Sequence, residues 1–542
     1  MLNADKSIKV DGLEKSIIDK CKQRIIAIAV IFFVSFIVVN IKLIDTAKPF
    51  KAKEQTSVNI KKLINRGNIL DRNGSILAVS LPTWILYKNS DEIFNIQSTH
   101  KKILQILPKL DKIKLKNHLK SKKSYQVISR HLTPEMAKNI NKLGEPALNF
   151  EKEYLRAYPY NEEISHIIGF LGTETEGLAG VEKKYDDILI TGKDVHLTID
   201  SRVQHKVFSA LQKGIKLYKY KGAVGIVLNV NTGEVIAGVS LPSFNPNPYT
   251  SFTPTKNQIT NSVFEMGSIF KSFTVASALN ENIVNQESKF DASQPLKLPG
   301  KIITDFHGKE RILDLGEVFT YSSNIGSGLI AQMLGIDKQY YYFEQLGFKK
   351  VLDIGVFETV KPVIIPRKKV TELDLVLMSY GHSIDISPMH AISALASTVN
   401  GGEYIEPMVV KDLKYLNRPS IKVFSKNVTN IMKTYYRNVV AEGTAKKIQS
   451  NNYMIGGKTG TSNKYIKGKQ SRKKVISSFI SFFPINNPKY AVFVLVDEPK
   501  SSKEIEVWGR TAGHNAVPIS KNIIMEIAPI LGIKKSFNNT EL

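Results

Sequence analysis

The residues best suited by type and spacing to covalent chemistry in this chain of 542 residues are Ser268 and Lys271. The apolar residues after them have helical spacing, so a helix beginning near Gly267 would carry both side chains. Residues three apart on a helix are neighbours, which puts the lysine amine within reach of the serine hydroxyl. A serine becomes a nucleophile when a base takes its proton, and a buried lysine with a lowered pKa can be that base. Ser-x-x-Lys alone is more often a capping serine followed by a surface lysine.

Two later motifs offer polar partners for this pair. Ser322 and Asn324 form Ser-x-Asn about 50 residues after Ser268, and Lys458-Thr459-Gly460-Thr461 follows about 130 residues later. Taken singly, the first is also typical of a helix cap, and the second contains an ordinary turn glycine. Ser-x-x-Lys, Ser-x-Asn and Lys-Thr-Gly in this order are the signature of penicillin-binding proteins and related serine β-lactamases. We therefore expect the three motifs to converge on one cleft.

The elements around these motifs predict one antiparallel sheet. Residues 224–230 and 235–239 have the pattern of strands joined by a tight turn, and a mostly helical region runs from about 310 to 400. Three further strands and a closing helix complete the pattern, at 454–462, 476–482, 490–496 and 520–531. This order predicts an α+β fold with a five-stranded antiparallel sheet, helices on both of its faces and a helical subdomain.

The N-terminal part of the chain contains a candidate membrane anchor. Residues 25–44 are mostly apolar and long enough to span a bilayer as a helix. The alternative is a cleaved signal peptide, but the sequence around Leu43 to Ala47 is a poor cleavage site. Basic residues flank both ends, so the positive-inside rule does not orient the segment. We predict a single-pass anchor, with residues 1–24 as a cytoplasmic tail and the bulk of the chain outside.

The segment between anchor and sheet predicts an elongated, mixed, non-catalytic module at residues 45–204. Within it, residues 65–78 have the pattern of strand, turn and strand around Asn73-Gly74, a pair that favours hairpins. Helical patches, a glycine-rich region and an alternating strand follow, at 100–145, 167–185 and 195–200. The remaining predicted boundaries give a catalytic domain at 205–535 and a C-terminal tail at 536–542.

Composition narrows the classes of function. The net charge is +26, from 75 Lys and Arg against 49 Asp and Glu, a balance that first suggests nucleic-acid binding. The lysines are spread along the whole chain and a membrane segment is present, so we do not expect nucleic acid as a partner. Cys21 is the only cysteine, so there is no disulfide framework. No spacing typical of metal ligands occurs, and we expect neither a metal nor another cofactor.

The chain after the anchor resembles the class B penicillin-binding proteins over nearly its whole length. The resemblance of the non-catalytic module rests on Arg66–Gly74 and on the glycine-rich region from Gly169 to Tyr185. Within the class, the chain looks most like the cell-division type, on the residues at 457–461, 496–500 and 511–516. Ser379–Pro388 matches the family's glycine-rich loop, except that Ser383 stands where a second glycine is usual. This departure concerns the local conformation of the loop and not the catalytic assignment.

The resemblance implies a septal peptidoglycan D,D-transpeptidase that cross-links stem peptides through a serine acyl-enzyme and is acylated by β-lactams. It implies that Ser268 is the nucleophile and Lys271 its base. Ser322 would relay a proton to the leaving amine, and Asn324 would hydrogen-bond the substrate backbone. Lys458 would favour a deprotonated Lys271 and attract the substrate carboxylate.

The same resemblance assigns substrate binding to the third motif. The hydroxyl groups of Thr459 and Thr461 would bind the terminal carboxylate, and Gly460 lies between them. Backbone N–H groups of Ser268 and Thr461 would form an oxyanion hole. Implied partners are stem peptides of the lipid-linked precursor or nascent glycan, a glycosyltransferase and other division proteins. The implied location is the inner membrane at the division septum, with the bulk of the chain in the periplasm.

Six basic residues crowd the segment after the third motif. The simplest interpretation is a solvated hairpin tip, and the alternative is contact with an anionic envelope polymer or lipid-linked precursor. These residues are Lys464, Lys467, Lys469, Arg472, Lys473 and Lys474.

Three rival functions stay open on the sequence. The first is an elongation-type class B transpeptidase. The second is a β-lactamase or β-lactam sensor, although an efficient hydrolase needs a water-activating carboxylate or a modified lysine and needs no anchor. The third is a catalytically inactive division scaffold, which has no reason to keep Ser268, Lys271 and Lys458 together.

Overall fold

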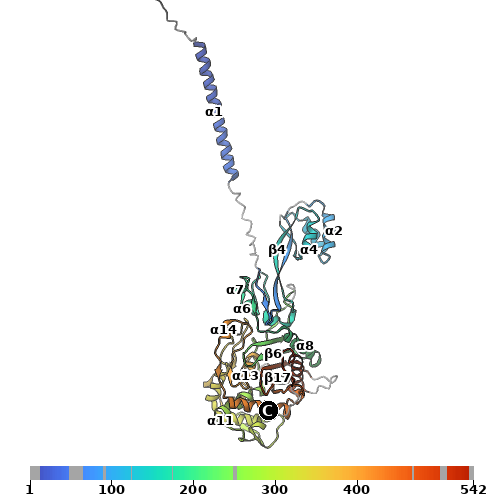
Figure 1. Cartoon of the computed structure of the whole chain (residues 1–542), viewed down its shortest axis with the longest axis vertical. Coiled ribbons are helices and arrows are strands. Elements are labelled where there is room, and N and C mark those ends of the chain that lie inside the picture. Colours follow the sequence, from blue (N-terminus) through green and yellow to red (C-terminus); the bar gives the residue numbers. More distant parts are fainter. Residues whose placement is uncertain are drawn as a thin grey trace, which may run out of the picture. The chain divides into compact units, whose positions relative to one another are not determined.

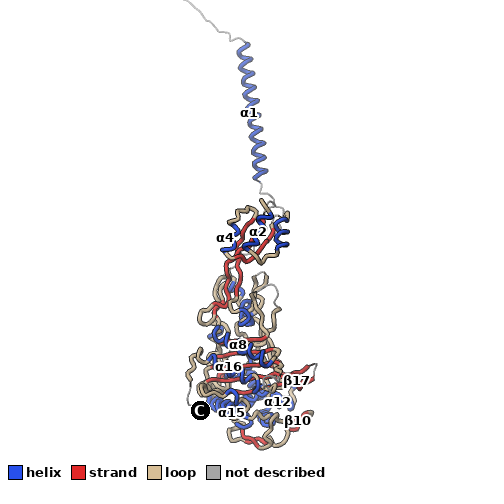
Figure 2. The backbone as a smooth tube through the Cα atoms, turned by 90° about the vertical axis from the view of Figure 1, so that its right-hand side faces the viewer, coloured by secondary structure: helices blue, strands red, loops and turns tan. Residues whose placement is uncertain are grey.

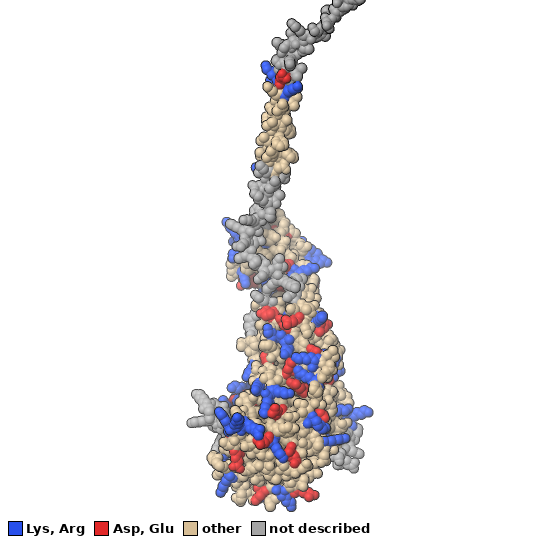
Figure 3. Space-filling view, turned by 90° about the vertical axis from the view of Figure 1, so that its left-hand side faces the viewer, with Lys and Arg blue, Asp and Glu red and all other residues tan. Residues whose placement is uncertain are grey.

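The protein, here a computed structural model, is described for residues 12–47, 65–89, 93–123, 125–173, 175–247, 253–466, 469–500 and 509–535. It divides into two units, residues 1–62 and 63–542. The first unit contains the helix α1 (Gly12–Ala47), in which Asp19–Asn40 is long and apolar enough to cross a membrane. Between Arg24 and Lys42 this helix carries no charged residue, seen as an uninterrupted tan stretch in Figure 3. The predicted anchor at 25–44 lies within α1.

The second unit begins with a five-stranded sheet in the predicted non-catalytic module (Figure 1). β1 (Ile69–Leu70) and β2 (Ile76–Lys88) form the predicted hairpin, and Gly74 turns between them at φ +87°. The other strands are β3 (Gln126–Leu132), β4 (Leu148–Ala157) and β5 (Val195–His196). β5 is shorter than the predicted strand at 195–200, because the chain turns there and Asp200 caps the next helix.

Three helices pack at the end of this module that lies away from the large sheet, as Figure 2 shows for α2 and α4. They are α2 (Ile96–Ile106), α3 (Lys112–Lys120) and α4 (Pro134–Asn141). Their apolar faces pack with Leu86 and Ile128 of the strands into a small separate core. The near part of the module contains α5 (Ser165–Ile168), α6 (Gly180–Lys184) and α7 (Asp186–Leu189). Its apolar residues, such as Ile167 and Val181, belong to the same core as the large sheet.

The large sheet has the predicted five antiparallel strands, in the order β16-β17-β18-β6-β7. Their bounds are Gly456–Ile466, Lys469–Phe483, Tyr490–Asp497, Gly222–Asn229 and Val235–Leu241. Strands β6, β7 and β18 are nearly continuous apolar runs in the sequence. This pattern fits their position, because nearly every residue in them is buried. β16, which carries the third motif, is one of the two edge strands.

Helices pack on both faces of this sheet. α8 (Ser201–Tyr218) and α16 (Ala516–Ile527) contact each other and the strands on one face, and α13 (Pro388–Ala396) contacts β6 and β18 on the other. α16 is the predicted closing helix, but it begins four residues before the predicted 520–531, because Asn515 caps it.

The helical subdomain surrounds α9 (Lys271–Asn280), in which every residue from Lys271 to Leu279 is buried. Its other helices are α10 (Leu315–Thr320), α11 (Asn324–Gln345), α12 (Glu372–Ser379) and α15 (Lys426–Ala441). The short elements are β8 (Lys289–Asp291), β9 (Leu296–Leu298), β10 (Lys301–Ile303), β11 (Ile312–Asp314), β12 (Val363–Ile364), β13 (Ile384–Asp385), β14 (Glu403–Tyr404), α14 (Leu413–Leu416) and β15 (Ile421–Lys422). The predicted fold class is confirmed.

Candidate active site

The turn that carries Ser268 lies against the edge strand β16 of the large sheet. A short 3₁₀ helix, η2 (Gly267–Phe270), leads into α9, so the helix predicted near Gly267 begins there with a tighter first turn. Gly267 has φ +60°, and a Cβ atom at this position would lie 2.7 Å from the Thr461 carbonyl oxygen. Glycine meets both conditions, and this contact holds Ser268 beside β16.

Lys271 is completely buried beneath Ser268. Its Nζ lies 2.9 Å from Ser268 Oγ, 3.1 Å from Ser322 Oγ and 2.8 Å from Asn324 Oδ1. It also donates to the Ser322 carbonyl oxygen at 2.6 Å. Residues of the first two motifs therefore meet on a single amine, although they are about 50 residues apart in the sequence.

Lys458 brings the third motif to the same point. It is completely buried on β16, and its Nζ donates to Ser322 Oγ at 2.8 Å, so this hydroxyl lies between two lysines. Burial lowers the pKa of Lys458 to about 7. Burial also holds the pKa of Lys271 well below its ordinary value, the charge of Lys458 lowers it further, and Asp305 opposes both. Lys271 is therefore set up to be a neutral amine that can accept a proton from Ser268.

Asp305, which the motifs do not include, fixes the second motif. Its carboxylate accepts the Ser323 hydroxyl at 2.7 Å and the backbone N–H groups of Asn324 and Ile325 at the start of α11. The Asn324 side chain accepts from Lys271 and donates from Nδ2 to the Thr304 carbonyl oxygen at 2.9 Å. The predicted hydrogen bond of Asn324 to the substrate backbone stays a prediction; in the structure both ends of its carboxamide contact the protein. Its visible effect is to orient Lys271.

The threonines of the third motif face the cleft from β16. The hydroxyl groups of Thr459 and Thr444 lie 2.6 Å apart, and Thr461 Oγ1 accepts from the Ala512 backbone N–H at 3.4 Å. A Cβ atom at Gly460 would lie 2.4 Å from the Met266 carbonyl oxygen. Gly460 therefore lets the strand approach the turn that carries Ser268.

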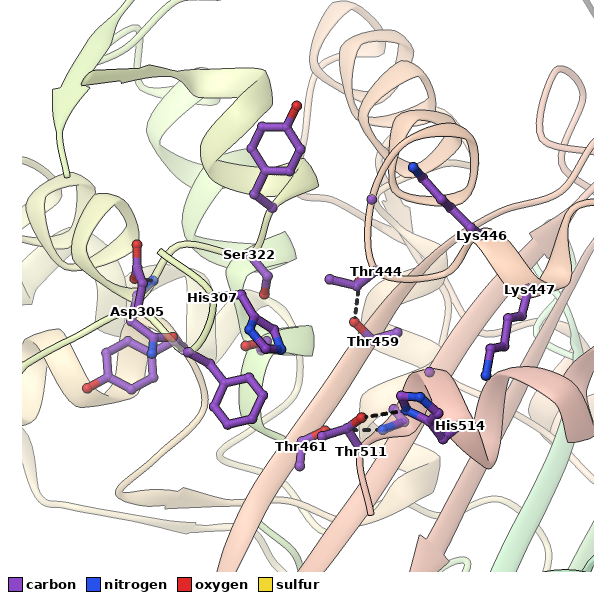
Figure 4. A pocket seen from close by; sticks show the side chains of 18 of the residues that line it. Asp305, His307, Ser322, Thr444, Lys446, Lys447, Thr459, Thr461, Thr511 and His514 are labelled. Atoms are coloured by element: carbon purple, nitrogen blue, oxygen red, sulfur yellow. Dashed lines mark hydrogen bonds between the residues drawn. The ribbon is translucent and has the colours of Figure 1, made fainter. Parts of the chain in front are cut away.

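The three motifs surround one cleft with a volume of about 530 Å³. Five of the predicted side chains line it: Ser268, Ser322, Asn324, Thr459 and Thr461. In Figure 4, Asp305, His307 and Ser322 lie on the side of the helical subdomain, opposite Thr459, Thr461 and His514. Lys446 and Lys447 extend the wall beyond Thr444 (Figure 4). The other lining residues include Phe306, Tyr321, Tyr380, His382, Asn463 and Thr511.

The glycine-rich loop has Ser383 where a second glycine is usual. Ser383 has φ +59°, in the left-handed region, and its backbone N–H donates to Glu265 Oε1 at 2.9 Å. Glu265 Oε2 lies 2.8 Å from His382 Nδ1. Two hydrogen bonds to Glu265, which directly precedes the turn of Ser268, therefore hold a conformation that serine rarely adopts. Glu265 is not part of any of the three motifs.

The same loop carries a carboxyl group that should make folding depend on pH. Burial, and next the charge of Glu265, raise the pKa of Asp385 from 3.8 to about 6. When the pKa of a carboxyl is higher in the folded than in the unfolded state, the free energy of unfolding of the protein falls as pH rises, here from about 4 to about 6. We expect Asp385→Asn to raise the free energy of unfolding at about pH 7.5 by about 1–3 kcal/mol, and to change it little near pH 4. Urea unfolding at both pH values checks this, and a variant that gains nothing at the higher pH contradicts it.

Two of the six basic residues after the third motif form ion pairs. Lys464 Nζ lies 2.7 Å from Asp497 Oδ1 and 2.9 Å from Glu498 Oε1, and Lys474 Nζ lies 3.5 Å from Glu498 Oε2. The predicted solvated tip is therefore wrong for Lys464, whose side chain is three-quarters buried. Lys467 and the side chains of Lys469, Arg472 and Lys473 lie outside the described residues.

Comparisons with known proteins agree with the geometry of the cleft. Residues 223–525 match the penicillin-binding protein transpeptidase domain, and residues 61–213 match the penicillin-binding protein dimerisation domain. A probable peptidoglycan D,D-transpeptidase FtsI of Caulobacter vibrioides is 34% identical over 493 residues, which cover 87% of this chain and 82% of that protein. Stage V sporulation protein D of Bacillus subtilis is 29% identical over 539 residues, covering 90% and 82%.

The FtsI of Escherichia coli is 25% identical over 490 residues, which cover 84% of this chain and 82% of that protein. A crystal structure of a peptidoglycan synthetase from Bifidobacterium adolescentis superposes with a TM-score of 0.70 at 18% identity. The superposition covers 88% of this chain and 97% of that one, and it shows a shared fold. With both domain matches in order after an apolar helix, the chain belongs to the class B penicillin-binding proteins and is of the FtsI-like kind.

Proposed function

We propose that this protein is a peptidoglycan D,D-transpeptidase of the cell-division type, with Ser268 as its nucleophile. The observation that carries the proposal is the position of Ser268 Oγ, 2.9 Å from a completely buried amine at the edge of an open cleft. The names of relatives of similar length, including the Caulobacter protein, support the same reaction. Acylation by β-lactams follows, because these drugs react with the same serine.

In the first half-reaction, Lys271 takes the proton of Ser268 Oγ as this oxygen attacks the carbonyl between the two terminal D-alanines. The C–N bond of that peptide breaks, and the proton reaches the departing amine through the Ser322 hydroxyl. Lys458 attracts the terminal carboxylate, which Thr459 and Thr461 bind. Backbone N–H groups of Ser268 and Thr461 stabilise the oxyanion, which is worth about 3–4 kcal/mol per donor in comparable sites.

The amine of a second stem peptide then replaces the serine and completes the cross-link. A single span near residues 25–44 would hold the protein in the inner membrane, with residues 1–24 in the cytoplasm and the rest in the periplasm at the septum. The division into a non-catalytic module at 45–204 and a catalytic domain at 205–535 belongs to the same proposal. A glycosyltransferase and other division proteins are the partners that this location implies.

The surroundings of Ser268 favour a transpeptidase over a β-lactamase. Two carboxylates beside the turn and the second motif, Glu265 and Asp305, both accept hydrogen bonds from the protein. Glu265 accepts from the glycine-rich loop, and Asp305 accepts from the start of α11. Because both carboxylates accept hydrogen bonds from the protein, we expect the acyl-enzyme to persist.

Intact-mass analysis after addition of benzylpenicillin tests the proposal. We expect a persistent adduct of one penicillin on the wild type and no adduct on Ser268→Ala. An adduct that is lost rapidly with turnover of the drug would indicate a β-lactamase, and a wild type without adduct would indicate an inactive scaffold. Depletion of the protein separates the two transpeptidase types, because loss of septal synthesis gives filaments and loss of lateral-wall synthesis gives rounded cells.

The charge of Lys458 should be visible in the pH dependence of acylation. Burial is the main cause of the lowered pKa of Lys271, and the neighbouring charge of Lys458 lowers this pKa further. In Lys458→Met this second effect is lost, so the pKa of Lys271 rises and less of it is neutral at a given pH. We expect the acidic limb of the acylation rate to move to higher pH. Stopped-flow acylation by benzylpenicillin across the pH range checks this, and a limb that stays in place or moves to lower pH contradicts it.

A further inference from the structure

A carboxylate–histidine pair reaches the active-site cleft from the glycine-rich loop. His382 Nδ1 lies 2.8 Å from Glu265 Oε2, and the side chains are 21% and 14% exposed. Glu265 is fixed in turn, because its other oxygen accepts the Ser383 backbone N–H at 2.9 Å. The acylation mechanism proposed above uses neither residue.

The pairing decides which nitrogen of His382 can act on a substrate. A carboxylate only accepts hydrogen bonds, so the neutral imidazole must carry its proton on Nδ1. Its Nε2 is then an acceptor, on the ring edge away from Glu265. The negative charge of Glu265 also stabilises the imidazolium that forms when Nε2 takes a proton, as the aspartate does in serine-protease triads.

The backbone brings His382 next to Ser268. The Gly267 N–H donates to the Gly381 carbonyl oxygen at 3.2 Å, and a Cβ atom at Gly381 would lie 2.3 Å from the Gly267 oxygen. Ser268 and His382 each follow one of these two touching glycines. Both side chains line the same cleft.

The second half-reaction needs a base that an incoming amine can reach. Lys271 does not meet this need, because its amine is completely buried and within 3.1 Å of Ser268, Ser322 and Asn324. His382, by contrast, lines the cleft with a side chain that is 21% exposed. A general base for the acceptor is therefore better placed in the loop than beneath the nucleophile.

The other two cleft-lining histidines in the described part of the chain lack a carboxylate partner. The ring of His307 packs edge-on against Phe306, with centroids 4.5 Å apart. His514 Nδ1 lies 3.1 Å from the Thr511 hydroxyl. His382 is thus the histidine whose partner fits it for proton transfer.

We propose that His382, oriented by Glu265, is the general base that activates the acceptor amine in transpeptidation; this inference rests on the proposed function. The amine nitrogen attacks the ester carbon of the acyl-enzyme, and its proton goes to His382 Nε2 as the N–C bond forms. The C–O bond to Ser268 breaks, and Ser268 Oγ takes a proton from Lys271, which regains one from cationic Lys458 through the Ser322 hydroxyl. The imidazolium releases its proton to water and Lys458 regains one from water, so protons and charge balance.

The experiment separates the two half-reactions in the full-length protein in detergent. Acylation is measured with benzylpenicillin, and aminolysis with a D-alanyl thioester donor and D-alanine as the acceptor amine. For His382→Gln and His382→Ala we expect the ratio of aminolysis to acylation to fall by about 100-fold or more, within the usual contribution of a general base. Free imidazole should restore part of the aminolysis by His382→Ala and none of that by His382→Gln, in which the side chain still fills the site.

Two further variants distinguish catalysis from structure. Glu265→Gln keeps a hydrogen-bond acceptor but loses the charge, and we expect the ratio to fall by about 10-fold. In His307→Gln, which changes a cleft histidine without a carboxylate partner, the ratio should stay at the wild-type value. The proposal is overturned if the His382 variants lose both half-reactions by the same factor, or if their ratio stays unchanged. A wild type that is never acylated would instead contradict the proposed function.

Discussion

Acylation of Lys271→Met by benzylpenicillin is expected to be about 10³- to 10⁴-fold slower than acylation of the wild type, the upper part of the range for loss of a general base. Methionine has a similar length and fills the buried site, but it has no lone pair of comparable basicity. Ser268 would then attack with its proton still in place. The measurement is the second-order rate of adduct formation, followed by intact mass or by a fluorescent penicillin.

A loss of positive charge from the cleft is the main competing explanation for such a decrease. Lys446→Met is a matched control, because it removes one positive charge from the rim of the same cleft without touching Ser268. We expect this control to slow acylation by less than about 10-fold, as electrostatic attraction alone would. If Lys271→Met were slowed no more than Lys446→Met, then Lys271 would act through charge, and the base would have to be sought elsewhere.

The convergence of the three motifs was predictable because each is short, local and diagnostic by residue type. What the sequence does not contain is the direction in which each side chain points. Asn324 shows this, since its carboxamide, at the wall of the cleft, also contacts Lys271 and Thr304. The distance from Asn324 to Thr304 is set by the path of a loop with no regular spacing, and the motif gives no information on it.

Residues that support the motifs were missed for the same reason. Asp305 and Glu265 reach the site from irregular segments, and no periodic pattern distinguishes them from surface carboxylates. The fold was easier to predict, because buried strands such as β18 are continuous apolar runs. The ends of strands were harder to predict. The alternating pattern continues to residue 200, but the strand β5 ends at His196 and Asp200 already caps α8.

Glu182→Ala is expected to lower the free energy of unfolding by about 3–5 kcal/mol, the range for removal of one member of a buried charge cluster. Glu182 is completely buried in α6, with Oε2 2.9 Å from Arg66 Nη2 and Oε1 2.7 Å from Arg156 Nε. Both arginines are themselves about 2% exposed. Without Glu182, two guanidinium groups stay buried beside each other with their shared counter-charge gone.

The loss should also extend beyond the module that contains the cluster. Arg66 lies just before β1, Arg156 lies on β4, and Glu182 lies on α6, whose Val181 belongs to the core of the large sheet. Residues as far apart as Val181 and Val227 share that core, so we expect one cooperative transition at a lower temperature rather than separate melting of the module. Differential scanning calorimetry of the full-length protein distinguishes these outcomes.

Asp186→Ala supplies the matched control for Glu182→Ala. Asp186 Oδ1 lies 2.8 Å from Arg66 Nη1, but its side chain is 26% exposed, so water can replace it once it is removed. We expect this variant to lose no more than about 1 kcal/mol, as partly exposed ion pairs do. A Glu182→Ala variant no less stable than Asp186→Ala would show that the buried arginines find other partners, and that packing rather than charge joins β1, β4 and α6.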